Sequence, residues 1–402
     1  MQNPREPYIG GESSFIELIQ PFSSGGTATF PGHYFIFTPD DDLSNILIRF
    51  TVQDYPENVY VYDPYHVEGD EEQTQKNLMA LNAMERESYR KMRKSYLFGL
   101  EYKKFTGRSY LAHYPRPRPS HFMWRADYFN QTHWITTNET RFISEPPPEL
   151  LPEITQFGKK RALRDTDPRP LAEHREEGVF NMTLKVISCA PRAFEVLNFL
   201  SQVEVEHLMD LAAAETLALS TTGDGDTDDE ISATRTSYNS WLERERSPIV
   251  DVIYRRAADL LRIDEALLRY RGDGEYRDLG TDYSIAEALQ LVHYDPNQEY
   301  TAHHDFGFNE LNDPFQAQRF ATLLLYLNEG MEGGETSFPR WVNAETFEEL
   351  KVVPQVGKAV LFYSQLPDGN MDDFSQHEAS VVTVGEKWLV NLWVWSPVYY
   401  ND

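Results

Sequence analysis

The segment LQLVHYDPNQEYTAHHDF, residues 289–306, decides how the second half of this chain folds. Its first six residues are mostly apolar, β-branched or aromatic, and this pattern predicts a strand that ends at Asp295-Pro296. His303 and Asp305 follow an extended stretch, and side chains two positions apart on a strand lie on the same side of it. Both side chains can therefore face the interior, whereas His304 between them is expected to point away.

The sequence on either side of this segment supports a mixed fold. Helical patterns precede it, at 204–215 and from Ser247-Pro248, an N-cap followed by a first-turn proline, to about residue 261. Short strand-like runs separated by Gly, Pro and Asp follow it, at 320–327, 359–363, 381–384 and 388–395. Helices followed by many short strands indicate an α+β fold. We expect its C-terminal strands to form a double-stranded β-helix (jelly roll) with flanking helices.

The first part of the chain has a different pattern. Strand-like runs at 34–37, 45–50 and 59–62 precede a Glu-, Lys- and Leu-rich stretch from about 70 to 98, which predicts one long helix. Prolines and charges then alternate between 144 and 178, which is typical of a linker. We predict three parts, namely a smaller N-terminal α+β domain at 1–143, a Pro-rich linker at 144–180 and a C-terminal domain at 181–402.

Composition limits the partners. The 402 residues exceed the usual length of one domain, and a hydrophobic content of 41% is ample for packed cores. The formal net charge of −27 argues against nucleic acid or an anionic membrane surface, because phosphate binding needs clustered Lys and Arg. No apolar run approaches the length of a membrane span. Nothing in the sequence indicates the oligomeric state.

The compartment stays open at this stage. A single cysteine, Cys189, excludes an internal disulfide, and residues 1–20 show no basic segment followed by an apolar run. Both observations favour the cytoplasm. Three N-glycosylation acceptor patterns, which begin at Asn130, Asn138 and Asn181, allow the lumen of the endoplasmic reticulum.

A third candidate metal ligand lies further along the chain. His377 begins another strand-like run, and with His303 and Asp305 it can supply two imidazoles and one carboxylate to one face of a metal. That donor set is the facial triad of non-haem Fe(II) oxygenases. The His-x-acid pattern alone decides little, since it also occurs at His66 and His174, and the first two residues taken alone are compatible with an ordinary loop.

Lys387 is the fourth residue of interest because it begins the strand-like run at 388–395. An ammonium group is costly to bury unless an anion pairs with it. A co-substrate carboxylate is one such partner. Alternatively, the side chain extends along the strand end and reaches water. The residues alone leave both interpretations open.

The combined motifs resemble the catalytic domain of the prolyl 4-hydroxylases, which are Fe(II)- and 2-oxoglutarate-dependent dioxygenases, over residues 189–397. The matching segments occur in the family's order. They are 191–201, 235–237, 289–306, 318–319, 322–327, 333–339, 357–362 and 377–393. The first 180 residues match no family that we can name. The resemblance implies Fe(II), 2-oxoglutarate as co-substrate, O₂, and ascorbate as reductant.

The resemblance also implies a role for each matching residue. Three would bind Fe(II): His303, Asp305 and His377. Three would hold the distal carboxylate of 2-oxoglutarate: Tyr294, Thr336 and Lys387. Three would contact a peptide substrate near the metal: Tyr300, Arg319 and Trp393. Of these residues, Lys387 and Arg319 are the ones that we expect to be catalytic. On sequence alone, Thr336 also suits the turn after Gly333-Gly334, and the aromatic residues also suit a core.

The function implied by the resemblance is hydroxylation of prolyl residues, at the 4-position, in a peptide or protein, with release of succinate and CO₂. Segments 221–229 and 306–316 are expected to fold over the peptide as lids. Two alternatives remain open: the same chemistry on a free amino acid, another side chain or a small molecule, and an N-terminal domain that acts as a binding or scaffold module. Repair of alkylated nucleic acid is disfavoured, because the chain shows no basic groove.

Overall fold

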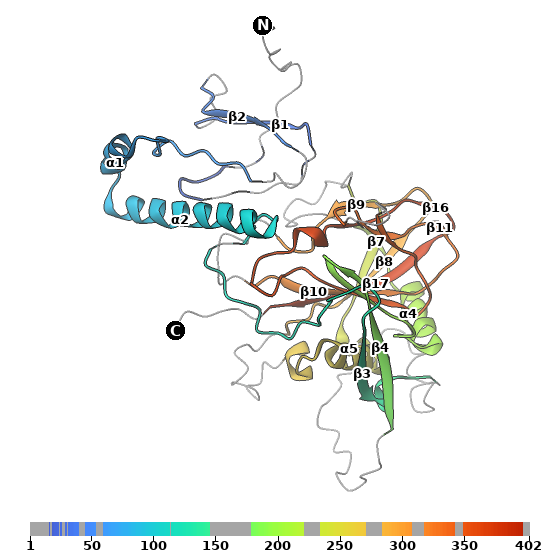
Figure 1. Ribbon diagram of the computed structural model, residues 1–402. Coiled ribbons are helices and arrows are strands. Elements are labelled where there is room, and N and C mark those ends of the chain that lie inside the picture. The colour runs from blue at the N-terminus through green and yellow to red at the C-terminus, as the bar shows by residue number, and fades with distance from the viewer. Residues whose placement is uncertain are drawn as a thin grey trace. The chain divides into compact units, whose positions relative to one another are not determined.

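The computed structural model describes residues 16, 18–23, 25, 29, 31–39, 45–53, 59–112, 114–144, 178–220, 234–270, 284–307, 317–341 and 349–396. The chain divides into two compact units (Figure 1). One comprises Met1–Ser109 with Phe308–Asn312, and the other comprises Tyr110–Gly307 with Asp313–Asp402. Among the described residues, no helix is both long and apolar enough to cross a membrane.

The first unit contains a strand pair and two helices. Strands β1 (Tyr34–Phe37) and β2 (Ile48–Thr51) pair antiparallel, and helices α1 (Glu71–Met79) and α2 (Ala83–Thr106) follow. The prediction of a single helix over 70–98 was wrong. Asn82 ends that continuity, because its side chain accepts a hydrogen bond from the Glu85 backbone while the Glu85 carboxylate accepts one from the Asn82 backbone. This capping box begins a new helix.

The strand predicted at 59–62 was also wrong, because this segment pairs with no strand in the part of the chain that the structure describes. Tyr60 instead stacks on Phe50 of β2, with ring centroids 4.4 Å apart. An aromatic run next to a two-stranded pair can thus contribute side-chain packing without joining the ladder.

The second unit is built on two antiparallel sheets. The larger sheet has nine strands, whose order is β3 (Thr132–Asn138), β4 (Val179–Cys189), β5 (Arg192–Val196), β14 (Ala359–Tyr363), β10 (Arg319–Tyr326), β17 (Lys387–Trp395), β8 (Leu289–Tyr294), β7 (Tyr238–Leu242), β6 (Ala218–Leu219). The smaller sheet has four: β13 (Leu350–Val352), β12 (Thr336–Phe338), β15 (His377–Ala379), β9 (Tyr300–His303). A separate pair joins β11 (Glu332–Gly333) to β16 (Val382–Val384). Among the described residues of this unit, the helical elements are α4 (Gln202–Ala214), α5 (Pro248–Leu261) and the 3-10 turns η1 (Glu139–Arg141), η2 (Arg244–Arg246), η3 (Glu265–Leu268) and η6 (Asp373–Ser375).

Alternation along β17 separates the two faces of the large sheet. Val390, Leu392 and Val394 join the apolar core that includes residues of α4 and α5, so the helices cover this face. Leu389 joins a second core with Phe338 of the smaller sheet. The two sheets therefore pack face to face, and the predicted α+β architecture with a jelly roll and flanking helices is confirmed. The odd-numbered positions of β17 from 387 to 393 face the space between the sheets, whereas Trp395 packs against the first core.

The domain boundary predicted at residue 143 differs from the structure. Strand β3 lies within the range assigned to the N-terminal domain, yet it pairs with β4 along its whole length, from Thr132 opposite Lys185 to Asn138 opposite Val179. Ile135 of β3 is buried in the core of the second unit. The first unit therefore ends at Ser109. Residues 145–177, most of the predicted linker, lie outside the described residues, as do segment 221–229 and residues 308–316 of the two predicted lids.

Candidate active site

Three of the predicted metal ligands come together where the two sheets face each other. His303 ends β9 and His377 begins β15, and the two histidines are opposite one another in the antiparallel register. Asp305 follows two positions after β9, and its carboxylate oxygens lie 3.9 Å from His303 Nε2 and 3.7 Å from His377 Nε2. One potential ligand atom from each residue lies within 4.8 Å of the others. In the part of the chain that the structure describes, this is the one such group of His, Cys, Asp and Glu side chains, so His66 takes part in none, and His174 lies outside the described residues.

Backbone carbonyls fix the tautomer of both imidazoles. His303 Nδ1 lies 2.8 Å from the Thr301 carbonyl oxygen, and His377 Nδ1 lies 3.0 Å from that of Ser375. Since a carbonyl oxygen only accepts, each Nδ1 carries the hydrogen and donates it. Burial lowers the pKa of His303 well below its usual value, which keeps this imidazole neutral. Both Nε2 lone pairs are then available to a metal ion.

The carboxylate of Asp305 is held in its charged form. Burial alone raises a carboxyl pKa, but His377, His303 and Arg319 outweigh it here and the pKa of Asp305 falls to about 2. Thr322 of β10 also donates a hydrogen bond of 2.5 Å to Asp305 Oδ2. The result is an ionised, oriented carboxylate next to two imidazoles that each present Nε2, which is a donor set that suits Fe(II).

Lys387 lies at the other end of the same space. Its side chain is fully buried, and among the described residues no group lies within hydrogen-bond distance of its Nζ. The nearest aromatic rings are those of Tyr294 and Tyr326, at 5.4 Å and 5.9 Å from Nζ. Burial lowers the pKa of Lys387 to about 7. The lysine therefore does not reach water at the strand end, and among the described residues no group forms a hydrogen bond with its ammonium nitrogen.

Two predicted partners of the co-substrate lie close to Lys387. Tyr294 is directly opposite it in the β8–β17 register, and burial raises the pKa of Tyr294 to about 12, so its hydroxyl stays protonated. Thr336 is buried on β12 and accepts a 2.7 Å hydrogen bond from the Tyr326 hydroxyl. Tyr326 was not singled out in the sequence. It lies four residues after Thr322 on β10, and because alternate residues of a strand share a face, both side chains lie on the same side of the sheet.

The remaining predicted residues gather beside the metal group. The Tyr300 ring stacks on the His303 ring, with centroids 3.5 Å apart. Arg319 places its guanidinium 3.9 Å from the centroid of the Trp393 ring, and Trp393 pairs with Thr322 in the sheet. The site-facing side of β17 thus carries Lys387 at one end and Trp393 next to the metal group.

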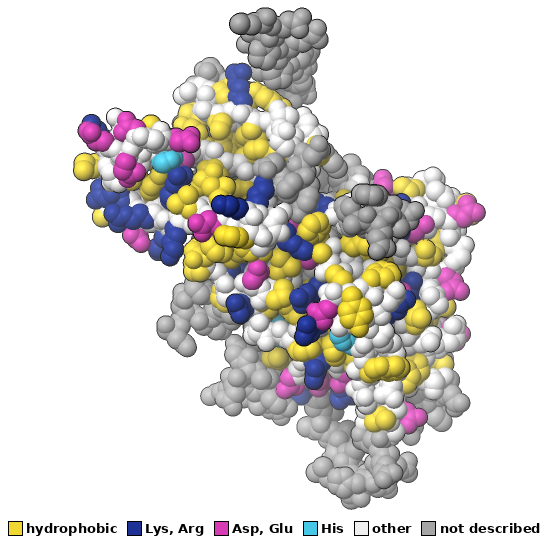
Figure 2. Space-filling view, in the orientation of Figure 1, with side chains coloured by type: hydrophobic (Ala, Val, Ile, Leu, Met, Phe, Trp, Pro, Cys, Tyr) yellow, Lys and Arg dark blue, Asp and Glu magenta, His cyan; other side chains and the backbone are white. Residues whose placement is uncertain are grey.

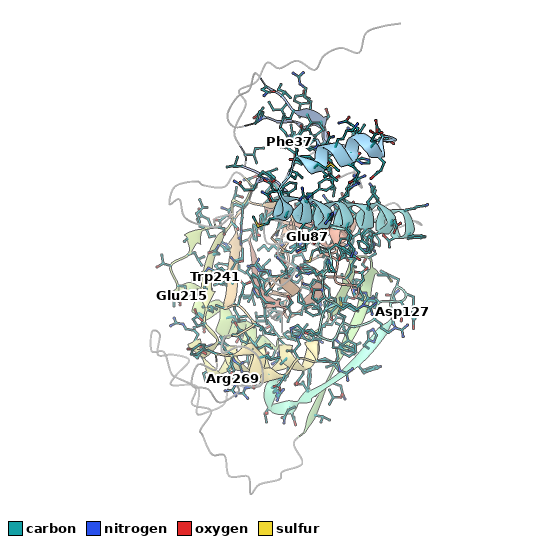
Figure 3. All side chains as sticks on the ribbon, turned by 90° about the vertical axis from the view of Figure 1, so that its left-hand side faces the viewer. Phe37, Glu87, Asp127, Glu215, Trp241 and Arg269 are labelled. Atoms are coloured by element: carbon teal, nitrogen blue, oxygen red, sulfur yellow. The ribbon has the colours of Figure 1, made fainter. Side chains whose placement is uncertain are left out.

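Several polar residues of this region were missed in the sequence. Glu287 accepts hydrogen bonds of 2.6 and 2.9 Å from Arg319 and one of 2.7 Å from the Trp395 indole. Arg235 lies with its guanidinium 4.7 Å from the centroid of the Tyr300 ring. Arg235 belongs to a segment that the resemblance had marked without a role, whereas Glu287 belongs to no motif. Trp241 of β7, labelled in Figure 3, has its ring 6.0 Å from that of Trp393.

The chain is similar to several known proteins. A model of the 2OG-Fe(II) oxygenase superfamily matches residues 289–395. The chain is 35% identical over 242 residues to probable prolyl 4-hydroxylase 3 of Arabidopsis thaliana, which covers 56% of this chain and 78% of the relative. It is 36% identical over 271 residues to probable prolyl 4-hydroxylase 8 of the same plant, which covers 64% of this chain and 83% of the relative. The chain belongs to the prolyl 4-hydroxylase family of 2OG-Fe(II) oxygenases. Among solved structures, a viral collagen prolyl hydroxylase from Paramecium Bursaria Chlorella virus-1, in its 2OG complex, matches with a TM-score of 0.38 and 24% identity, over 51% of this chain and 96% of that one.

Membership of the prolyl 4-hydroxylase family implies Fe(II), 2-oxoglutarate and O₂. The residues present fit these groups. His303, Asp305 and His377 offer two imidazole nitrogens and one carboxylate, all close together. The buried ammonium of Lys387, with no partner among the described residues, fits a carboxylate of the co-substrate. On the face shown in Figure 2, both Lys and Arg side chains and Asp and Glu side chains lie at the surface, with several Lys and Arg side chains close together.

The hydrogen bond from Thr322 gives a first test of the site. Thr322→Val is expected to weaken Fe(II) binding by about tenfold, because groups that orient a metal ligand typically contribute this much to affinity. Anaerobic calorimetry with Fe(II) measures the effect. Thr322→Ser keeps the hydroxyl and should retain affinity close to that of the unchanged protein. Equal affinities for the Val and Ser variants would contradict the role given to Thr322.

The pKa of Lys387 predicts how 2-oxoglutarate binding depends on pH. The dianion binds the ammonium form, and its charge raises the lysine pKa from the value of about 7 in the unliganded protein. Affinity is therefore greatest below pH 7 and falls, by up to about tenfold per pH unit, above it. Calorimetric titrations of 2-oxoglutarate from pH 6 to 9 test this. Lys387→Arg stays charged throughout and should give a flat profile, so a sloping profile in that variant would contradict the assignment.

Proposed function

We propose that this chain hydroxylates prolyl residues, at the 4-position, in a peptide or protein, and releases succinate and CO₂. The observation that carries the proposal is the arrangement along β17. A buried ammonium suited to the co-substrate, Lys387, and an aromatic residue suited to the substrate, Trp393, lie on one face of one strand, beside the three candidate metal ligands. The relatives named prolyl 4-hydroxylases support the choice of substrate.

In this proposal the two ends of the space have separate tasks. His303, Asp305 and His377 bind Fe(II), which supplies together with 2-oxoglutarate and O₂ the oxidising power that inserts one oxygen atom into a C–H bond. Lys387 pairs with the distal carboxylate of 2-oxoglutarate, and the hydroxyls of Tyr294 and Thr336 lie where they can donate to the same carboxylate. Binding the far end of the co-substrate orients its keto-acid end toward the metal group.

At the end of the space where the substrate is expected, two aromatic rings and an arginine held by hydrogen bonds are available for binding. Tyr300 and Trp393 offer ring surfaces to the proline ring of the substrate, since aromatic grooves are a usual way to bind proline-rich segments. Arg319 is kept in place by Glu287 and by the Trp393 ring, and its remaining N–H groups can donate to peptide carbonyl oxygens. A bound peptide would also exclude water from the metal group. Ascorbate is proposed as the reductant that keeps the iron ferrous.

The test uses the full chain with Fe(II), 2-oxoglutarate, O₂, ascorbate and a panel of proline-containing peptides. We expect succinate in proportion to peptide turned over, and fragmentation mass spectrometry should place one added oxygen atom on a proline. Omitting ascorbate should shorten the period of activity. Succinate formation with the added oxygen on another residue type, or on a small molecule alone, would contradict the prolyl substrate while leaving the oxygenase chemistry intact.

A further inference from the structure

A chain of three buried polar side chains crosses the large sheet beside the metal group. Arg235 Nη2 donates to Gln290 Oε1 at 3.1 Å, and Asn391 Nδ2 donates to the same oxygen at 3.1 Å. This network fixes how the amides are oriented. A guanidinium has no acceptor, so the Gln290 atom that faces it must be the oxygen. That oxygen cannot donate, so Asn391 must present its NH₂ group to it, and Asn391 Oδ1 points elsewhere.

Asn391 Oδ1 is buried and, among the described residues, has no donor within hydrogen-bond distance. Asn391 is an odd-numbered position of β17, on the side that faces the smaller sheet, and lies between Lys387 and Trp393. It pairs with Leu324 of β10, one step along the face from the Thr322–Trp393 pair that adjoins Asp305. Same-face neighbours on a strand are about 7 Å apart, so this acceptor lies next to the reaction centre.

A buried acceptor without a donor calls for a ligand that donates. Neither co-substrate can do so, because 2-oxoglutarate as a dianion and O₂ offer only acceptors. The target proline cannot either, since its nitrogen carries no hydrogen within a peptide. The nearest donor in a bound peptide is the backbone N–H of the residue that follows the proline. Two buried donors without partners among the described residues, Arg235 Nε and Trp393 Nε1, complement the carbonyl oxygens of the same backbone.

We propose that Asn391 Oδ1 accepts a hydrogen bond from the backbone N–H of the residue that follows the target proline. This inference rests on the proposed function and adds a specificity to it. A proline followed by a second proline lacks this N–H and should be a poor target. In a run of prolines, the last one should be preferred.

The test compares two peptides that differ in one atom. One has a proline–glycine amide, and the other has an ester at that position, so that oxygen replaces the N–H with little change in shape. Their dissociation constants are measured with the full chain loaded with Mn(II) and 2-oxoglutarate, and kcat/KM is measured with Fe(II) and O₂. We expect the amide peptide to bind about tenfold more tightly, which is the effect of one hydrogen bond whose acceptor is otherwise left unpaired.

Two variants separate this hydrogen bond from other effects of the ester, whose carbonyl is also a weaker acceptor. Asn391→Leu removes the acceptor and should reduce the difference between the peptides to about twofold or less, mainly by weakening the amide peptide. Asn391→Thr keeps a hydroxyl that can donate to Gln290 Oε1 and accept from the peptide N–H, and it should retain part of the preference. Thermal unfolding of both variants checks that they are folded.

The outcomes distinguish the two levels of the proposal. Equal binding of the amide and ester peptides by the unchanged protein would overturn the role of Asn391, whatever the variants do. A preference that persists in full in Asn391→Leu would overturn it too. Absence of binding and turnover with every proline peptide would instead contradict prolyl hydroxylation, on which the inference rests.

Discussion

Asp305→Ala is expected to lower succinate formation by at least about a thousandfold, because it removes the one negative ligand from the metal group and with it several kcal/mol of interaction with Fe(II). The loss should come from metal binding. Fe(II) content after anaerobic loading and desalting, together with succinate formation at saturating co-substrate, measures both parts of the effect. Asp305 is buried and accepts the hydroxyl hydrogen of Thr322, so the alanine variant leaves that hydroxyl without its acceptor.

Two controls make this prediction specific. Thermal unfolding of Asp305→Ala should show a folded protein whose midpoint is altered by only a few degrees. His66→Ala changes a histidine in the same His-x-acid pattern, but in the first unit and outside the metal group, and should retain full iron content and activity. If Asp305→Ala keeps its iron, or if His66→Ala loses it, the assignment of the metal ligands is wrong.

Lys387→Met is expected to raise the KM for 2-oxoglutarate by about a hundredfold or more, since a buried charge-assisted pair contributes roughly 3 kcal/mol when its partner is lost. The same variant should stabilise the unliganded protein by about 1–3 kcal/mol, because methionine fills the same space without an unpaired polar group. Initial rates of succinate formation at varied 2-oxoglutarate measure the KM, and chemical denaturation without the co-substrate measures the stability. If Lys387 had only a structural role, the KM for 2-oxoglutarate would stay unchanged in this variant.

The stabilities of the unliganded and the 2-oxoglutarate-bound protein should respond to Lys387→Met in different ways. Lys387 has no partner within hydrogen-bond distance among the described residues, and burial lowers its pKa. The buried lysine therefore lowers the free energy of unfolding of the unliganded protein. 2-Oxoglutarate should therefore stabilise the unchanged protein but leave the methionine variant nearly unaffected. Stabilisation of both proteins to the same extent would place the co-substrate away from Lys387.

Local patterns in the sequence indicated the jelly roll, the three candidate metal ligands and Lys387. Alternation on a strand places His303 and Asp305 on one side, and an unpaired lysine at the start of an apolar strand suggests an anion. The adjacency of β9 and β15, which brings His377 opposite His303, depends on pairing between distant segments. Local pattern does not specify such pairing, and the family resemblance supplied it.

The features missed in the sequence depend on tertiary contacts. Glu287 is an ordinary acidic residue until Arg319 and Trp395 converge on it. Strand β3 was assigned to the wrong domain because its partner, β4, lies beyond the Pro-rich segment. The helix over 70–98 was predicted without its break, since Asn82 and Glu85 read as ordinary polar residues of a helix until their capping box is seen. In each case the structure depends on an interaction between residues whose types, taken one at a time, do not indicate that interaction.

The most direct test of the central claim is a crystal structure of the full chain with Mn(II) and 2-oxoglutarate, grown without oxygen. We predict that the metal is bound by His303 Nε2, His377 Nε2 and one carboxylate oxygen of Asp305. We also predict that the distal carboxylate of 2-oxoglutarate lies within hydrogen-bond distance of Lys387 Nζ. A metal bound by other residues, or a co-substrate whose distal carboxylate lies away from Lys387, would contradict this claim.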